Sequence, residues 1–279
     1  MIRTIYIELY KIAGKPRSYI GFIFIAVIGL LIHLAMYLDG TAYISMVTQS
    51  LEQTFNIEGK ILNGNLVCFI ILQMLIIHVP LLVALVTGDL MSGEAASGTL
   101  RLLATKPVSR MHLLMAKFIT GAIYTFILLI FLAVVALAGG LFIFGNGDLI
   151  VLRSDGLTIL PEGAILWRFF AAFGVAYVAL LAVAALSFML SCFSNNSIGP
   201  IITTMAIIIL FTIIATLEVS LFDTIKPYLF TTYMVSWRLF FDEPVEYARI
   251  INSLLILSAH IILFLLIAVR HFNKKDILI

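Results

Sequence analysis

Six apolar stretches of bilayer-crossing length follow one another along this chain and constrain its fold more than any other feature. A helix needs about 20 predominantly apolar residues to cross the hydrocarbon core of a bilayer. The stretches cover residues 19–38, 65–87, 113–144, 165–191, 198–219 and 250–269. We therefore predict an all-α membrane protein with six transmembrane helices in one domain, residues 1–279.

The composition supports a membrane protein over a soluble one. Of 279 residues, 62% are hydrophobic and only 11% are charged, which is more apolar surface than one soluble core can hide. The basic start resembles a signal peptide, but residues 19–38 are longer than a signal core and no small-residue cleavage site closes them. We expect a retained anchor, and nothing in the charge distribution supports a nucleic-acid partner.

The distribution of Lys and Arg predicts the orientation of the chain. Residues 1–17, 88–117 and 270–279 hold 11 of the 17 basic residues and four acidic ones. Basic residues concentrate on the cytoplasmic side of membrane proteins. Both termini and the 88–117 segment are therefore expected in the cytoplasm.

Residues 2–16 predict an amphipathic helix lying in the membrane interface. Its apolar face has the spacing of one helical side: Ile2, Ile5, Tyr6, Leu9, Ile12 and Ala13. The other side carries the charged residues Arg3, Glu8, Lys11 and Lys15. Gly14 and Pro16 end the helix. The alternative is an ordinary frayed N-terminus.

Residues 220–248 are apolar enough to suggest a seventh crossing, but they contain Asp223, Lys226 and Arg238. A seventh crossing would also place the basic C-terminal tail outside. We predict a re-entrant or interfacial hairpin on the outer face, between the fifth and sixth spans. At the same face Arg168, which begins the fourth span, is expected to snorkel toward the headgroups.

The polar interruption at residues 88–117 has a readable plan. Thr99–Thr105 predicts a short helix with Leu100 and Leu103 on one side, and Pro107 ends it. Ser109 stands where the third span needs an N-cap, and Lys117 is expected to snorkel. Such an apolar-faced cytoplasmic helix suits a groove on a partner protein, or alternatively a lipid surface.

This segment resembles the signature of ABC-2-type transporter permeases. The resemblance rests on Gly93-Glu94, Gly98-Thr99-Leu100 with Leu103, Lys106-Pro107-Val108-Ser109-Arg110, and Lys117. It implies a permease subunit that pairs with a second permease subunit, a copy or a close paralogue, and docks separate nucleotide-binding ATPase subunits. It implies ATPase-coupling roles for Glu94, Gly98, Thr99, Leu100, Arg101, Leu103, Pro107 and Arg110.

The chain contains no Walker A, dinucleotide-binding or His-Glu-x-x-His pattern, so we expect no catalytic site, metal or cofactor of its own and ATP bound by the partner. Glu94 has two alternatives to a coupling role: an ion pair with Arg101 or Arg110, or a solvated charge.

Three histidines, His33, His78 and His260, fall at membrane depth, where ionisable residues are functional candidates. Interhelical hydrogen bonding is favoured over a shared metal site or a proton relay. Pro80 is expected to kink the helix that carries His78.

The resemblance and the apolar spans together predict an exporter of a hydrophobic or amphipathic compound in the bacterial cytoplasmic (inner) membrane. Two alternatives stay open. One is an ATPase-coupled, force-transmitting or regulatory component without a transported substrate. The other is a stand-alone secondary transporter or channel, whose internal repeats and paired intramembrane charges are not evident here.

Overall fold

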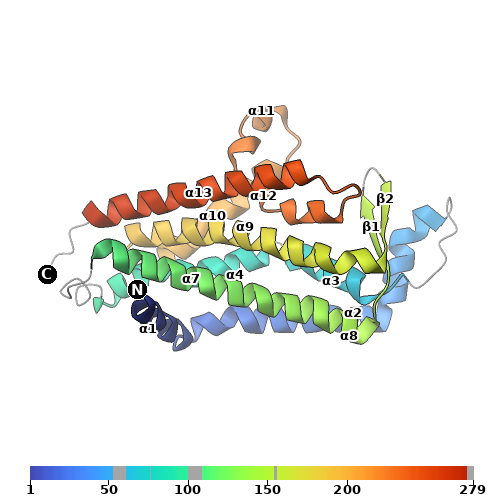
Figure 1. Cartoon of the computed structure of the whole chain (residues 1–279), viewed down its shortest axis with the longest axis horizontal. Helices are drawn as coiled ribbons and strands as arrows, with labels where there is room; N and C mark the ends of the chain where they lie inside the picture. Colours follow the sequence, from blue (N-terminus) through green and yellow to red (C-terminus); the bar gives the residue numbers. More distant parts are fainter. Residues whose placement is uncertain (53–60, 76, 100–108, 154–155, 275–279) are drawn as a thin grey trace.

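The computed structural model describes residues 1–52, 61–75, 77–99, 109–153 and 156–274. Its helices lie roughly parallel to one long axis (Figure 1). Five helices or helix runs are long and apolar enough to cross a membrane: Arg17–Met46, Arg110–Phe144, Glu162–Phe193, Ile198–Thr216 and Tyr247–Lys274. The chain is therefore a mainly helical, membrane-embedded protein.

A bent pair of helices, α3 (Gly64–Leu75) and α4 (His78–Thr87), is the sixth candidate, with 56° between its halves. Pro80 lies in the first turn of α4, where its missing N–H leaves no helical hydrogen bond unmade. The change of direction expected near Pro80 lies at the break before α4, the helix that contains Pro80.

The helix boundaries differ from the apolar stretches in an informative way. Helix α2 runs from Arg17 to Glu52, well beyond residue 38, where the predicted span ends. Polar residues such as Asp39 end the apolar run without interrupting the helix. Helix α7 (Arg110–Ala133) begins at the predicted N-cap, because the Ser109 hydroxyl accepts a hydrogen bond from the His112 N–H.

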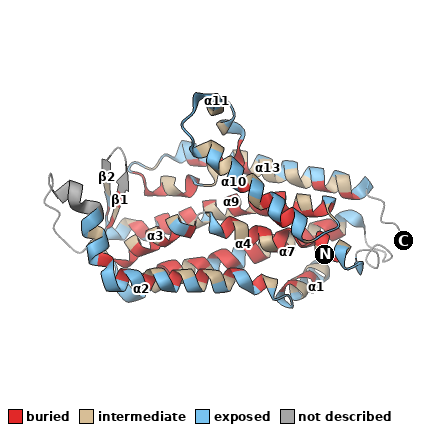
Figure 2. Ribbon diagram, turned by 180° about the vertical axis from the view of Figure 1, so that it is seen from behind, coloured by how far each residue is buried: buried red, intermediate tan, exposed pale blue. Residues whose placement is uncertain are grey.

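Helix α9 (Ile165–Phe193) is the centre of the bundle. Buried residues make up 56% of its most apolar window, a larger share than in the other four candidate spans. Figure 2 shows the same pattern, with buried residues along the inner faces and exposed residues on the outside. Helix α9 packs against α4, α7, α10 (Ile198–Thr216) and α13 (Tyr247–Lys274). Helix α7 continues into the π-helical turn η1 (Val134–Ala138) and α8 (Gly139–Phe144).

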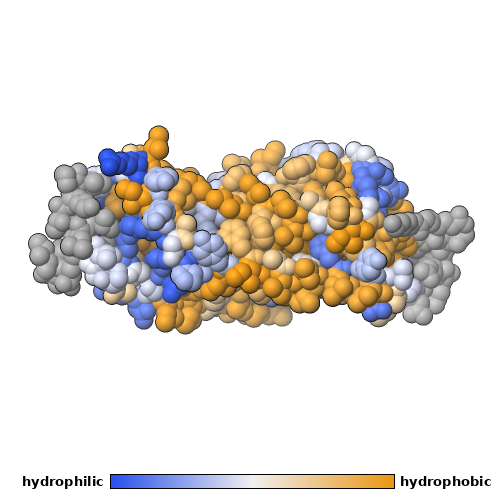
Figure 3. Space-filling view, turned by 90° about the horizontal axis from the view of Figure 1, so that it is seen from below, coloured by the Kyte–Doolittle hydropathy of each residue, from blue (hydrophilic) through white to orange (hydrophobic). Residues whose placement is uncertain are grey.

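The bundle has two polar ends. The N-terminal helix α1 (Ile2–Ala13), the short helix α5 (Ser92–Ala96) and the end of α13 lie at one end, which we call the terminal end (Figure 1). On the face shown in Figure 3, hydrophilic residues gather toward the two ends and hydrophobic residues cover the middle. This distribution is the one expected of a protein that crosses a bilayer.

The opposite end carries a β-hairpin that the all-α prediction did not include (Figure 1). Strands β1 (Leu149–Arg153) and β2 (Gly156–Leu160) pair antiparallel, with Leu149 opposite Leu160. The Asn63 side-chain amide fastens the hairpin by donating to the carbonyl of Asp148 at 2.7 Å. Asp-Gly between two apolar runs is a hairpin signal that the sequence did contain.

Residues 220–248 form a series of short elements rather than one crossing helix: α11 (Ser220–Asp223), η3 (Lys226–Tyr228), α12 (Phe230–Tyr233) and η4 (Ser236–Phe241). Helix α11 projects from the side of the bundle (Figure 1). The η4 turn instead packs inward, with the Phe241 ring against Phe69 and Phe169 at centroid distances of 5.1 and 5.0 Å.

Arg168 does not snorkel, which corrects the prediction. It is buried, and its guanidinium donates to the carbonyls of Phe240 and Asp242 at 2.9 Å each. It also pairs with the carboxylate of Glu243. Arg168 therefore holds the end of η4 against α9. Buried backbone carbonyls need a hydrogen-bond donor, and Arg168 supplies it to both of these carbonyls.

Candidate functional site

Four charged side chains meet where α1, α5 and α7 come together at the terminal end. Glu8 and Lys11 lie one turn apart on α1, Glu94 lies on α5, and Lys117 lies on α7. We call these four residues the ion network. Two carboxylates and two ammonium groups give it no net charge.

The distances in the ion network are those of direct ion pairs. The Lys117 Nζ lies 2.6 Å from Glu8 Oε2 and 2.8 Å from Glu94 Oε1. The Lys11 Nζ lies 2.6 Å from Glu8 Oε1 and 2.8 Å from Glu94 Oε1. Each ammonium group thus bridges both carboxylates, and three segments distant in sequence are joined at one point.

Most of the network is shielded from solvent. The Lys117 side chain is 1% exposed, and those of Glu8 and Glu94 are 5% and 10% exposed. Burial alone would raise the pKa of Glu8, but the Lys117 and Lys11 ammonium groups outweigh it and hold that pKa below its usual range. Burial would likewise lower the pKa of Lys11, and hydrogen bonds to Glu8 and Glu94 raise it above its usual range.

A third carboxylate, Asp89, attaches the turn that follows α1. Its two oxygens lie 2.8 Å from Lys15 Nζ and 2.8 Å from Arg17 Nη1. Asp89 lies between α4 and α5, so α1 and the start of α2 are both tied to this stretch of chain. Loss of the contacts with Lys15 and Arg17 would leave the buried Asp89 carboxylate without these partners.

Two sequence predictions about charged residues are wrong. Glu8 was expected on the polar, outward side of the first helix, but it is buried, whereas Tyr6 and Tyr10 are exposed. Lys11, expected on the same side, is partly exposed and reaches both Glu8 and Glu94. Lys117 was expected to snorkel, but it is buried between two carboxylates. Attraction to the two glutamates outweighs hydration because all three groups are held in contact.

Among the described residues, the partners of Glu94 are not the ones considered from the sequence. Its carboxylate pairs with Lys11 and Lys117, and it is too buried to be a solvated charge. Arg110 donates from Nη1 to the carbonyls of Phe272 and Asn273, at 3.2 Å each, near the end of α13. Arg101 lies outside the described residues.

Only part of the predicted coupling element is described. Gly98 has a φ of 72°, the left-handed conformation that glycine adopts at least cost, and turns the chain out of α5. The Thr99 hydroxyl donates to the carbonyl of Glu94 at 3.4 Å. Leu100, Arg101, Leu103 and Pro107, and with them the predicted helix over 99–105, lie outside the described residues.

A cleft of about 1030 Å³ opens beside the ion network at the terminal end. Charged residues from the end of α1, from the turn after it and from α5 face this cleft, among them Lys11, Lys15 and Glu94. Ser97 and Thr99 complete its wall next to residue 100. Its mixed charge suits a protein surface better than a small apolar ligand.

The three intramembrane histidines do not converge. Each directs Nδ1 at the carbonyl four residues earlier in its own helix, at 2.6 Å for His33, 3.0 Å for His78 and 2.8 Å for His260. Of these, His260 also reaches another element, with Nε2 3.2 Å from the carbonyl of Tyr228. Among the residues that the structure describes, a hydrogen bond to another element is therefore found for His260 and not for the other two.

No cluster of three or more His, Cys, Asp and Glu side chains in the described part of the chain is arranged to hold a metal ion. In the ion network, Glu94 Oε1 contacts both ammonium groups, whereas Glu94 Oε2 is buried without a hydrogen-bond partner among the described residues.

Comparison with known proteins gives one family and one relative. A family model described as "Protein of unknown function (DUF2705)" matches residues 22–278, nearly the whole chain after α1. A protein of Bacillus subtilis (strain 168), described as "Uncharacterized protein YhcI", is 27% identical over 198 residues. This alignment covers 69% of the chain and 63% of the relative, so the chain spans less than two thirds of the relative's length.

Proposed function

We propose that this chain, which belongs to the DUF2705 family, is the permease subunit of an ATP-driven exporter that receives mechanical work from a separate ATPase through α5 and the segment after it. One observation carries the proposal. The ion network joins α5 to α1 and α7 immediately before the 98–110 segment, whose sequence resembles ABC-2-type permeases.

The ion network makes these elements move together. Separating a buried ion pair and leaving one charge unpaired costs about 3–5 kcal/mol. Displacement of α5 would therefore carry Lys117 and the start of α7 with it rather than break the contact with Glu94. Helix α1 follows through Glu8 and Lys11. A push on this end would thus reach a membrane-spanning helix directly.

The break between α3 and α4 supplies a place where such a push can be absorbed. Helix α4 leads to α5 through Asp89, and α3 continues beyond the 56° bend toward the opposite end. Short breaks in membrane helices act as hinges in domain and helix motions. In this proposal α4 and α5 tilt together relative to α3, and the bundle alternates between two packings.

The docking surface in this proposal is the terminal end, including the cleft beside the ion network. We place this end and both termini in the cytoplasm of a bacterium, because the Lys and Arg residues concentrate there. With α3 and α4 counted as one crossing, the proposed topology has six spans. The partner chains would be the ATPase and a second permease subunit.

Co-purification tests the proposal. The chain is extracted from its native membrane in mild detergent, and the bound proteins are searched for a chain with Walker motifs. Leu100→Asp and Leu103→Asp are expected to lose that partner, whereas the matched exposed-site control Leu217→Asp is expected to retain it. Absence of any ATPase from the wild-type preparation, or full retention by both Asp variants, would refute ATPase coupling.

One structural observation favours the alternative of a force-transmitting component without a substrate. The opposite end is larger than the sequence suggested, because α2 reaches Glu52 and a β-hairpin is added. An ATPase that co-purifies, combined with an envelope protein whose capture needs the β-hairpin and with no cargo that changes ATPase rate, would favour this alternative over export.

A further inference from the structure

A long apolar groove runs between two helices on the side of the bundle, away from the ion network. Helix α7, the turn η1 and α8 form one wall, and α9 forms the other. The hollow is about 530 Å³, within the range typical of ligand sites. Its lining includes Phe126, Ile130, Val134, Phe170 and Tyr177.

The groove has no free polar group to recognise a polar ligand. The one polar side chain in its lining is Tyr177, whose hydroxyl already donates to the carbonyl of Ala122 at 3.2 Å. The Tyr177 ring packs edge-on against Phe126 at 5.3 Å. The remaining lining residues are aliphatic or aromatic, or are alanine and glycine. An occupant must therefore be hydrocarbon over its whole length inside the groove.

Two backbone features keep the groove open. Gly174 is exposed on α9, and a Cβ built there would meet no atom within 4 Å. On the facing wall, the π-helical turn Val134–Ala138 interrupts the α-helix. π-helical turns are uncommon in proteins, and those that occur are often found at functional sites. A larger side chain in place of Gly174 would reduce the volume of the groove between this turn and α9.

The direction of the groove is that of a lipid chain, and its longer wall exceeds the depth of one leaflet. Its lining on one side runs from Phe126 to Leu141, which is about 20 Å at the rise of a helix. One leaflet of the hydrocarbon core is about 15 Å deep. Helices α7 and α9 run along the long axis of the bundle, so the groove is parallel to chains that stand in the bilayer (Figure 1).

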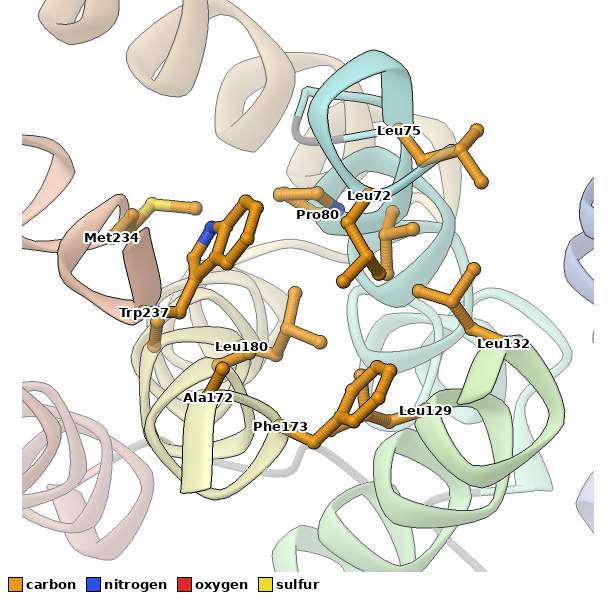
Figure 4. Close-up of a pocket in the computed structure, with 13 residues that line it drawn as sticks. Leu72, Leu75, Pro80, Leu129, Leu132, Ala172, Phe173, Leu180, Met234 and Trp237 are labelled. Carbon is orange, nitrogen blue, oxygen red and sulfur yellow. The ribbon is translucent and has the colours of Figure 1, made fainter. Parts of the chain in front are cut away.

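The groove shares a wall with an internal cavity. Leu129 and Phe173 line both spaces. The cavity, of about 60 Å³, lies beside the break between α3 and α4, and Leu72, Leu180 and Trp237 also line it (Figure 4). Leu129 and Phe173 thus form the partition between the two spaces.

We propose that this groove binds one acyl chain of a bilayer phospholipid. The inference does not depend on ATPase coupling, since the groove and its lining are features of this chain alone. A second copy of the chain packed over the groove is the competing occupant, and the test below distinguishes the two.

The experiment uses the full-length chain in nanodiscs of phosphatidylethanolamine and phosphatidylglycerol that contain a phospholipid with a diazirine in its acyl chain. After illumination, the labelled peptides are identified by mass spectrometry. Gly174→Leu fills the groove, and because the site has open space the variant is expected to fold. Ala206→Leu, a similar small-to-large change at an exposed position on α10, is the control.

We expect labelling at the groove residues to exceed that at the exposed faces of α10 and α13. It should fall several-fold in Gly174→Leu and stay unchanged in Ala206→Leu. Equal labelling around the whole bundle, or unchanged groove labelling in Gly174→Leu, would overturn the proposal. Efficient disulfide cross-linking of Phe170→Cys between two copies would also overturn it by assigning the groove to a dimer contact, since Phe170 is 65% exposed at the rim.

Discussion

Replacing Lys117 with Met removes the most deeply buried charge of the ion network while keeping a long apolar side chain. Glu8 and Glu94 would then share Lys11 as their common cation. Breaking a buried ion pair costs about 3–5 kcal/mol. We expect the lower value, about 3 kcal/mol, because Lys11 still contacts both carboxylates. The cost falls on the attachment of α1, whose inward face is held by this network.

Hydrogen exchange of the α1 amides measures that cost directly. Because 1.4 kcal/mol is a factor of ten in an equilibrium constant, α1 should open about 100-fold more often in Lys117→Met. Lys11→Met is the control, since the Lys11 side chain is 38% exposed and water in the cleft can replace it. Its effect should stay below about 1 kcal/mol. Exchange in Lys117→Met within about threefold of the wild type would refute a structural role for the network.

Three further outcomes follow from the same physical arguments. Arg168→Lys should lose about 2–4 kcal/mol of stability, seen as faster proteolysis in η4, because two buried carbonyls lose the planar donor that serves both. A spin label on α1 should stay immobile between pH 4.5 and 10.5, the ordinary pKa values of Glu and Lys. The Glu8 contribution is lost as pH falls through its lowered pKa, and the Lys11 contribution is lost as pH rises through its raised pKa. Gly64→Ala should destabilise the fold by about 1–3 kcal/mol in a denaturant titration, since its Cβ would lie 2.5 Å from backbone atoms of α8. Gly174→Ala should not destabilise it, because a Cβ there meets no atom within 4 Å. Equal stability of the two variants would contradict this packing.

The long apolar runs and the local helix-end residues were predictable from the sequence. Apolar runs longer than a bilayer must lie in a membrane as helices, whichever neighbours they find, so α7, α9, α10 and α13 lie close to their predicted ranges. Local chemistry was equally readable at Ser109, which caps α7, and at Pro80, beside the break between α3 and α4. These features depend on a few neighbouring residues.

The charged residues were less predictable because their environment is supplied by distant parts of the chain. Lys117 alone reads as a snorkelling residue, and Glu8 alone reads as a solvated charge on an amphipathic helix. They become buried partners because α1 packs against α7 and α5. This packing brings together Glu8 and Lys117, which are 109 residues apart in the sequence. The Glu8–Lys11 spacing of one turn was the local signal available, and it does not say which way the pair faces.

Hydropathy and charge patterning by themselves determined that this chain is helical and membrane-embedded. The free energy of transferring a segment into lipid is to a first approximation the sum of its residues' contributions, so it can be read from the sequence. Only the tertiary structure decided that Glu94 is held between Lys11 and Lys117, that Arg168 fastens the η4 turn, and that α7 and α9 leave an apolar groove between them. Those arrangements depend on contacts between residues far apart in sequence, and the free energy of a buried charge or an open groove is set by what surrounds it.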